Sequence, residues 1–382
     1  MIGEMTTVAH LIAPISFGGG ESLLSNLLRE RRPGVREIVI SVYRSDAFSQ
    51  NLDAAGITHY ELLDRTLGHG ISKIAMAWNT PLLLMRLPQL LLLLRRERVN
   101  VLHAHGYPAS ILGALVSRLA SMPSVYTHHF YRAKPSNVER FVLGICYRAF
   151  AVCTGVSKVV TESMQRAFPN VAERFLTIHN CVGLNFFKAE AESEFQQLRT
   201  AGRALFVQIA RFSSFKNQML VVESLGRLTP AERSCVRVVF AGEGVERAVV
   251  MARARELGLA KETLFLGFVP YERLPGLLAC ADFGLFPSEN EGFGIGAAEC
   301  LAAGLPVLSL DTELMKEVVG DAGLQLSREY FYKGFGMMLS HGASLRGRAE
   351  ERAKRYLPEQ IKNQYVEVYR HLGGLCITSP LR

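Results

Sequence analysis

Short apolar runs alternate with longer amphipathic stretches along most of the chain. The apolar runs, several of them rich in β-branched residues, predict strands at 7–13, 37–43, 99–104, 123–128, 150–154, 204–210, 236–241, 263–266, 283–286 and 306–310. Between them, apolar residues recur at helical spacing, which predicts helices at 20–30, 109–121, 138–148, 216–228, 246–257, 271–280 and 294–303. This alternation is typical of βαβ units, in which helices cover the faces of a parallel sheet.

A polar segment, Lys188 to Gly202, separates two such series of elements. We therefore place one α/β domain at 1–187, a linker at 188–202 and a second α/β domain at 203–356. Both domains are expected to be doubly wound and to face each other across a central cleft. In such sheets ligands bind beyond the carboxyl ends of the strands, so the chemistry is expected there.

Composition narrows the class of protein. Hydrophobic residues make up 49% of the chain and charged residues 20%, which predicts a folded globular protein. The seven cysteines are scattered without a CxxC pair, which argues against a disulfide framework and favours a reducing, cytoplasmic compartment. Glu4 and Pro14 do not fit a signal peptide, and the leucine-rich run from Pro81 to Leu94 is too short and interrupted to span a bilayer.

The positive charge is concentrated in the N-terminal half. Of the net charge of +8, residues 1–190 carry 20 lysines and arginines against 13 acids, and the remaining residues carry 23 against 22. The arginines are spread out and no nucleic-acid-binding module is recognisable, so nucleic acid is not an expected partner. An anionic membrane surface or a phosphorylated acceptor fits this excess, and a solvated basic face is the simpler explanation.

Two loops that follow predicted strands are suited to bind phosphate. In SFGGGESLL, Gly18, Gly19 and Gly20 allow close backbone approach to an anion before a helix begins, although a strand-to-helix turn also explains them. In ARFSSFKNQ, Arg211 and Lys216 flank a polar loop, where two cations can hold a diphosphate. A GxGxxG dinucleotide fingerprint is absent from the sequence.

Two carboxylates and three glycines occur together in the stretch SENEGFGIGAAECLAAGLPVLSLD. Gly292, Gly294 and Gly296 precede or open a predicted helix, so backbone amides there can meet a phosphate. Glu291 lies in the loop and Glu299 on the helix. Next to an anion such acids are favourable only if they accept hydrogen bonds from hydroxyls, and a ribose or a hexose supplies them. The spacing therefore predicts a phosphate on the amides and a sugar beside each acid.

Four histidines follow two strands of the first domain. His103 and His105 are expected to share a strand face, and His128 and His129 end the next predicted strand. No acid or cysteine accompanies them at zinc-ligand spacing, so a metal site is not expected. We expect a structural hydrogen-bonding role for His103, and a histidine at the end of 123–128 to orient a reacting sugar.

These motifs together resemble a known family. GGGE, HAHG, ARFSSFKNQ, VVFAGEGVER, LFLGFVP and PSENEGFGIGAAECLAAGLPVL occur in the order found in the retaining, nucleotide-sugar-dependent glycosyltransferases of family 4, which have the two-domain GT-B fold. The resemblance implies that the first domain binds the acceptor and that the segment 357–382 returns to it as a helix. The donor-binding residues it implies are Gly18, Gly19, Gly20, Arg211, Lys216, Phe293, Gly294, Ile295, Gly296 and Glu299.

The resemblance also assigns roles. Glu299 would bind the ribose of the donor, Glu291 would contact the transferred sugar, and Arg211 and Lys216 would bind the diphosphate. The catalytic residues implied are His129 and Glu291, with His128 as the alternative histidine because the two histidines are adjacent. No D-x-D motif is present, and the cations and helix amides can neutralise the leaving group, so no metal or other cofactor is expected.

The expected activity is transfer of a sugar from a UDP- or GDP-linked donor to a glycan or lipid-linked acceptor in cell-envelope polysaccharide or glycolipid synthesis. The enzyme is expected to be cytoplasmic and to dock on the inner face of the membrane through Arg132, Lys134 and Arg140. A GT-B nucleotide-sugar epimerase and a non-catalytic sugar-nucleotide-binding protein are the alternatives. An NAD-dependent oxidoreductase is disfavoured by the missing dinucleotide fingerprint.

Overall fold

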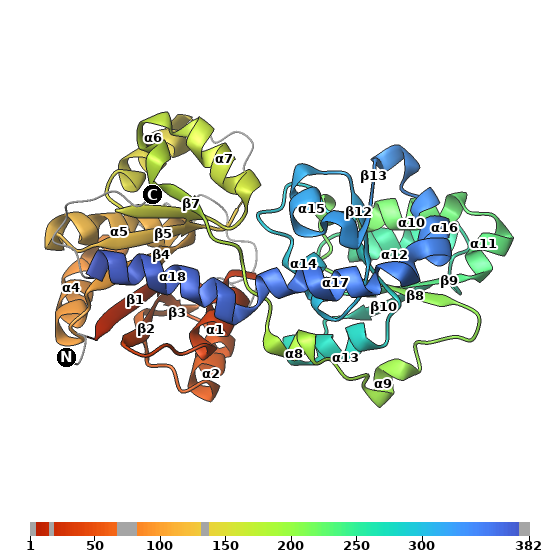
Figure 1. Cartoon of the computed structure of the whole chain (residues 1–382), viewed down its shortest axis with the longest axis horizontal. Coiled ribbons are helices and arrows are strands. Elements are labelled where there is room, and N and C mark those ends of the chain that lie inside the picture. The colour runs from red at the N-terminus through yellow and green to blue at the C-terminus, as the bar shows by residue number, and fades with distance from the viewer. Residues whose placement is uncertain (1–4, 15–18, 67–81, 131–136, 374–382) are drawn as a thin grey trace. The chain divides into compact units, whose positions relative to one another are not determined.

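The chain folds into two compact units, each built on its own parallel sheet. The computed structural model describes residues 5–14, 19–66, 82–130 and 137–373 (Figure 1). The first unit contains Met1–Cys181 and Pro358–Arg382, and the second contains Val182–Leu357. Residues 188–202 belong to the second unit and include the short helix α9 (Ser193–Gln196). The predicted class, two doubly wound α/β domains, is confirmed.

The sheet of the first unit has seven strands in the order β3-β2-β1-β4-β5-β6-β7, and all neighbours pair in parallel. Because the strand order reverses between β1 and β4, their carboxyl ends form the position where such sheets bind ligands. The strands are β1 (Thr6–Ile12), β2 (Val35–Arg44), β3 (His59–Thr66), β4 (Val101–His105), β5 (Ser124–His128), β6 (Val152–Gly155) and β7 (Phe175–Thr177).

Helices cover both faces of this sheet, and the last helix of the chain is one of them. The helices are α1 (Gly19–Arg29), α2 (Asp46–Ala54), α4 (Leu87–Arg96), α5 (Gly106–Ala120), α6 (Asn137–Tyr147), α7 (Lys158–Ala167) and α18 (Pro358–Gly373). Helix α18 packs on α1, β1 and β4, and Figure 1 shows it beside them in blue. Its Ile361, Tyr365 and Tyr369 are buried in one apolar cluster with Val8 and Val101.

The second unit has a six-stranded sheet in the order β10-β9-β8-β11-β12-β13, again with parallel neighbours. The strands are β8 (Ala204–Ile209), β9 (Val236–Ala241), β10 (Thr263–Gly267), β11 (Phe283–Phe286), β12 (Val307–Leu310) and β13 (Gly323–Leu326). The helices are α8 (Leu184–Phe187), α9, α10 (Gln218–Arg227), α11 (Pro230–Ser234), α12 (Arg247–Glu256), α13 (Leu274–Ala279), α14 (Ile295–Ala302), α15 (Glu313–Val318), α16 (Lys333–His341) and α17 (Arg346–Ala353).

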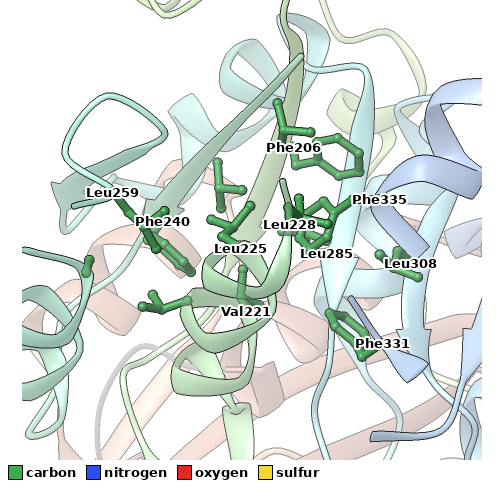
Figure 2. Close-up of a cluster of buried hydrophobic side chains, with 14 of the residues drawn as sticks. Phe206, Val221, Leu225, Leu228, Phe240, Leu259, Leu285, Leu308, Phe331 and Phe335 are labelled. Carbon is green, nitrogen blue, oxygen red and sulfur yellow. The ribbon is translucent and has the colours of Figure 1, made fainter. Parts of the chain in front are cut away.

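Phenylalanine, leucine and valine side chains form a buried cluster in the second unit (Figure 2). Phe206 of β8 meets Phe335 of α16 edge to face, with ring centroids 5.0 Å apart. Phe240 of β9 stacks on Phe265 of β10 at 5.0 Å. Burial of such rings is a large share of the stability of a sheet covered by helices. The core therefore holds the strands, and with them the loops at their carboxyl ends, in a fixed register.

The leucine-rich run of the first unit is a packed helix. It forms α4, in which Leu90 and Leu94 are buried while Leu92 is exposed. Within the part of the chain that the structure describes, no helix is long and apolar enough to cross a membrane.

Candidate functional site

The loop after β8 carries the two cations predicted to hold a diphosphate. Arg211 is exposed two residues beyond the end of β8, and Lys216 ends a short 3₁₀ turn, Ser214–Lys216. Asn217 follows with a φ of 54°, a left-handed conformation that asparagine tolerates better than most residues, and α10 begins at Gln218. The loop thus turns sharply between strand and helix.

Two glutamines that sequence reasoning missed hold this loop. The side-chain amide of Gln208 donates to the backbone oxygen of Lys216 at 2.8 Å. The side-chain amide of Gln218 donates to the backbone oxygen of Arg211 at 3.0 Å. Both glutamines are buried, so these bonds are shielded from competing water. The sequence signal for Gln208 is a polar residue within the apolar run ALFVQI, whereas Gln218, the first residue of α10, has no such signal.

A second set of bonds fastens this loop to the one before α14. Asn217 donates through its side-chain amide to the backbone oxygen of Pro287 at 2.8 Å, and the backbone amide of Glu289 donates to the oxygen of Phe215 at 2.8 Å. Arg328 donates to both Asn217 and Glu289, at 2.9 Å each. The loops after β8 and β11 are therefore one rigid surface, although about 70 residues separate them.

Helix α14 begins where the glycine spacing predicted. Gly294 precedes Ile295 with a φ of 81°, and a Cβ there would lie 2.8 Å from Met315 and 3.1 Å from the ring of Phe286. Gly296 faces the backbone oxygen of Ile209, 3.2 Å from where its Cβ would be. The first amides of a helix lack intrahelical partners, so this packed start offers donors to an anion.

Lys216 and Glu291 form an ion pair across the two loops. Their side chains are only 18% and 15% exposed, so water screens the attraction weakly. The ammonium group also lies 5.5 Å and 5.4 Å from the ring centres of Phe215 and Phe286. The structure thus brings together the predicted phosphate-binding cation and the predicted sugar-binding acid, and the two charges neutralise each other.

Glu299 lies on α14, buried within the same unit. Burial raises the pKa of its carboxyl to about 8, and a hydrogen bond with Tyr271 and the nearby charge of Lys216 oppose this rise only in part. The carboxyl is therefore largely protonated at neutral pH. Tyr271, in the 3₁₀ turn Tyr271–Arg273, is a further site residue that the sequence pattern did not single out.

The predicted residues of the first unit fall at the ends of β1 and β5. Gly18 lies outside the described residues, and Gly19 and Gly20 open α1. His129 directly follows β5. His128, the last residue of that strand, points toward two tyrosines instead, with its Nδ1 3.2 Å from the hydroxyl of Tyr126 and 3.3 Å from that of Tyr147. The two adjacent histidines thus have different surroundings.

A cluster of buried histidines adjoins His129. His103 and His105 share a face of β4, as predicted, and His10 of β1 joins them. A ring nitrogen of each of these three lies within 4.8 Å of one on the other two, a spacing open to a metal ion. However, both nitrogens of His103 are engaged, with Tyr369 at 2.6 Å and Thr127 at 2.7 Å. Its expected structural hydrogen-bonding role is confirmed, and the filled nitrogens do not favour a metal ion.

Two sequence profiles of known families together match most of the chain. The profile described as Glycosyltransferase Family 4 matches residues 17–186. The profile described as Glycosyl transferases group 1 matches residues 190–329. The first match lies in the first unit except for residues 182–186, and the second match lies entirely in the second unit.

Individual proteins show the same likeness. The chain is 25% identical over 240 residues to an uncharacterized glycosyltransferase of Methanocaldococcus jannaschii, and 23% identical over 246 residues to the α-D-kanosaminyltransferase of Streptomyces kanamyceticus. These matches cover 58% and 60% of this chain, and span only 60% and 64% of the two relatives.

A solved structure extends the likeness to nearly the whole chain. The HepE protein of Anabaena, in complex with UDP, superposes with a TM-score of 0.78 at 19% identity, covering 96% of this chain and 100% of that one. The same protein has been solved with UDP-glucose. At this identity the superposition shows a shared fold.

The raised pKa of Glu299 makes a testable prediction about stability. The folded pKa of about 8 lies above the ordinary value of 4.5, so the folded protein holds this proton more tightly than the unfolded chain. The wild-type free energy of unfolding should therefore fall as pH rises from 4.5 to 8, whereas Glu299→Gln cannot ionise. From pH 5.5 to 8.5 the advantage of the variant should grow by about 3 kcal/mol.

Urea unfolding followed by circular dichroism measures this difference at each pH. Glu272→Gln, at an exposed carboxylate next to Tyr271, is the matched control and should show no such growth. A Glu299→Gln difference that stayed constant across the pH range would show that Glu299 is ionised in the folded protein.

Proposed function

This chain belongs to glycosyltransferase family 4 and has the GT-B fold, and on that premise we propose that it is a retaining, metal-independent hexosyltransferase. Its donor is a nucleotide sugar, linked to UDP or GDP. Its acceptor is a glycan or a lipid-linked molecule in cell-envelope polysaccharide or glycolipid synthesis. The observation that carries the proposal is the joined pair of loops after β8 and β11, which presents a cation, two acids and helix amides on one surface.

The donor-binding roles follow from the chemistry of these groups. Glu299 accepts hydrogen bonds from the two ribose hydroxyls. These bonds favour the ionised carboxylate over the neutral form that burial imposes on the protein without a ligand. Arg211 and Lys216 bind the diphosphate. The amides of the segment Phe293, Gly294, Ile295 and Gly296, at the start of α14, face the same anion. The UDP bound by the related HepE protein supports this assignment.

When the donor binds, its diphosphate replaces Glu291 as the partner of Lys216. A diphosphate carries more negative charge than one carboxylate and competes for the ammonium group of Lys216. Glu291, once released, is free to accept hydrogen bonds from the hydroxyls of the transferred sugar. Phosphate binding is thus coupled to the availability of the acid that orients the sugar.

Charge stabilisation accounts for transfer without a metal ion. As the glycosidic bond lengthens, negative charge grows on the diphosphate, and Arg211, Lys216 and the helix amides stabilise it. The sugar then carries positive charge, and the acceptor hydroxyl attacks from the face that the leaving group vacates, which retains the anomeric configuration. Its O–H bond breaks as the new glycosidic bond forms, and the proton passes to the departing diphosphate oxygen. From the first unit we assign His129 to the reacting sugar, and Gly18, Gly19 and Gly20 to the phosphate.

The contacts of the two adjacent histidines favour His129 over His128 in this role. His128 is 8% exposed and directed to Tyr126 and Tyr147, so its nearest polar contacts are inside the unit. His129 lies beyond the strand and is partly exposed. The side chain of His129 thus extends past the end of the strand, and its buried Nδ1 has no hydrogen-bond partner among the described residues.

The acceptor proposal places the enzyme in the cytoplasm, docked on the inner face of the membrane. Helix α6 of the first unit exposes Phe141 by 71% and Ile145 by 49%, and Arg140 beside them is exposed as well. Apolar side chains next to a cation suit the boundary between headgroups and acyl chains of an anionic bilayer. Arg132 and Lys134, also expected to contribute, lie outside the described residues.

The two acids should separate binding from turnover. Thermal-shift titration with UDP, GDP and ADP first identifies the base, since a bound nucleotide raises the melting temperature. Glu299→Gln should then weaken that nucleotide about tenfold or more. Glu291→Gln should bind it as tightly as wild type, or more tightly because Lys216 is freed, while kcat falls at least about tenfold.

Isothermal titration and an assay of labelled-sugar transfer give both quantities, and Glu272→Gln should match wild type in each. Unchanged transfer in both acid variants would refute the site. A product in which the donor sugar is isomerised while still attached to the nucleotide would identify an epimerase instead.

Activity should survive removal of divalent ions. With Arg211 and Lys216 as the counter-charge, transfer in excess EDTA should stay within about twofold of the rate with Mg²⁺, since no ion bridges the diphosphate. The measurement is the initial rate after dialysis against EDTA, with a metal-dependent glycosyltransferase as the control. Full loss of activity in EDTA, reversed by Mg²⁺ or Mn²⁺, would contradict the proposed charge stabilisation.

Membrane docking should depend on α6. The protein should co-sediment with vesicles that contain anionic lipid and should be released by salt, because each basic residue near such a surface contributes about 1 kcal/mol. Combining Phe141→Ser with Ile145→Ser should reduce binding severalfold. Val249→Ser on α12, a side chain 61% exposed in the second unit, is the matched control. Equal recovery in the supernatant with neutral and anionic vesicles would exclude docking.

A further inference from the structure

A line of buried polar side chains runs through the first unit and ends at His129. Lys362 of α18 pairs with Glu37 of β2, whose other carboxylate oxygen lies 3.0 Å from Nε2 of His10. Nδ1 of His10 lies 3.0 Å from Nε2 of His105, and Nδ1 of His105 lies 3.3 Å from Nε2 of His129. Each consecutive pair of imidazoles is stacked at 26°. The line therefore joins three strands of the sheet, β2, β1 and β4, and the covering helix α18 to one candidate catalytic side chain.

Water is excluded from most of this line. His10 and Lys362 are fully buried, His105 is 4% exposed, and the side chain of Glu37 is 8% exposed. In such surroundings each hydrogen bond needs one donor and one acceptor, because a mismatched pair cannot turn to solvent. A group that can only accept, or only donate, hydrogen bonds therefore determines which atom is the donor in every bond along the line.

Glu37 is such a group, because it can only accept hydrogen bonds. Burial acts to raise its pKa, but the hydrogen bond from His10 and the charge of Lys362 hold the pKa below its ordinary value, so it is an ionised carboxylate that can only accept. His10 must therefore donate through Nε2. Burial lowers the pKa of His10, and it lowers those of His105 and His129 as well, so all three rings are neutral.

A neutral imidazole has one donor nitrogen and one acceptor nitrogen, so the assignment at His10 determines the assignment at the next two rings. With Nε2 of His10 protonated, its Nδ1 accepts from Nε2 of His105, and Nδ1 of His105 then accepts from Nε2 of His129. His103 does not branch the line, because its two nitrogens face Tyr369 and Thr127. Nδ1 of His129 is left as an acceptor, and among the described residues it has no hydrogen-bond partner.

We propose that Glu37, His10 and His105 are positioning residues that fix His129 as its Nε2-protonated tautomer. Its Nδ1, which is buried and has no partner among the described residues, is then kept as an acceptor for a hydroxyl group of the ligand. That this ligand is the reacting sugar rests on the proposed function. The ordering of the protons does not, because it follows from the contacts within the first unit. We call the line from Lys362 through Glu37, His10 and His105 to His129 the relay. Because Lys362 belongs to α18, the returning helix helps to determine the protonation of His129.

One isosteric substitution should invert the whole relay. In Glu37→Gln the side-chain oxygen stays with Lys362, which can only donate, and the NH₂ group then points at Nε2 of His10. His10 must now accept there and donate through Nδ1, and the same reversal passes through His105. His129 should therefore become the Nδ1-protonated tautomer, three side chains away from the changed atom.

Nuclear magnetic resonance of protein with ¹⁵N-labelled histidine reads this directly, since the two nitrogens of each tautomer have distinct chemical shifts and couplings. In the wild type at pH 7.5, signals of His10, His105 and His129, assigned from single histidine-to-glutamine variants, should all show the Nε2-protonated form. In Glu37→Gln all three should show the Nδ1-protonated form, and in the control Glu97→Gln, at a carboxylate paired with Arg36 in the same unit, none should change.

An Nδ1-protonated His129 in the wild type, or a His129 tautomer unaffected by Glu37→Gln in a folded protein, would overturn the proposal. If Glu37→Gln does not fold, the wild-type spectrum decides alone, because any of the three histidines in the other tautomer breaks the relay. A second readout uses transfer: Glu37→Gln should lower kcat about tenfold with nucleotide affinity unchanged. Ordered tautomers without any transfer activity would refute the proposed function and leave the relay standing.

Discussion

Parallel pairing of every strand in both sheets places the loops that follow the strands on a single edge of each sheet. In the second unit this constraint brings Lys216, after β8, to the loop before α14, although the two segments are far apart in sequence. In the first unit it aligns His10 of β1 with His103 of β4 in direct register. The polar clusters in both units are products of this arrangement, since each draws on side chains from neighbouring parallel strands.

Both units contain charged side chains that are largely removed from water, and in both units a pairing of opposite charges compensates for the lost hydration. Among the described residues, each unit contains a largely buried lysine–glutamate pair, Lys216 with Glu291 and Lys362 with Glu37. Burial keeps Glu299 near the first pair and His10 near the second pair neutral. An unpaired charge in these places would lose most of its hydration without compensation. This matters for function, because the pKa of a group that is neutral only through burial changes strongly when a polar ligand binds next to it.

The sequence alone predicted the α/β class, ten strands and the start of α14 close to where they lie, because those segments have strong apolar patterning and glycine punctuation. It missed β3, which carries five polar or charged residues among eight, β7, which has three residues, and β13, which has four and begins with a glycine. It missed Gln208 and Gln218, which act through backbone oxygens and have no side-chain partner to pair in a pattern. It could not find the relay, because contacts such as that of Glu37 with Lys362 depend on tertiary packing across 325 residues.

The return of α18 to the first unit has a consequence for how the protein is made. Lys362, Tyr365 and Tyr369 complete the polar interior of a sheet whose strands were all synthesised before residue 180. Until the ribosome has added the entire second unit and this last helix, the carboxylate of Glu37 has no ammonium partner. The second unit, continuous in sequence, has no such delay. The unit whose strands are synthesised first is therefore completed only after the second unit, when α18 supplies the partner of Glu37.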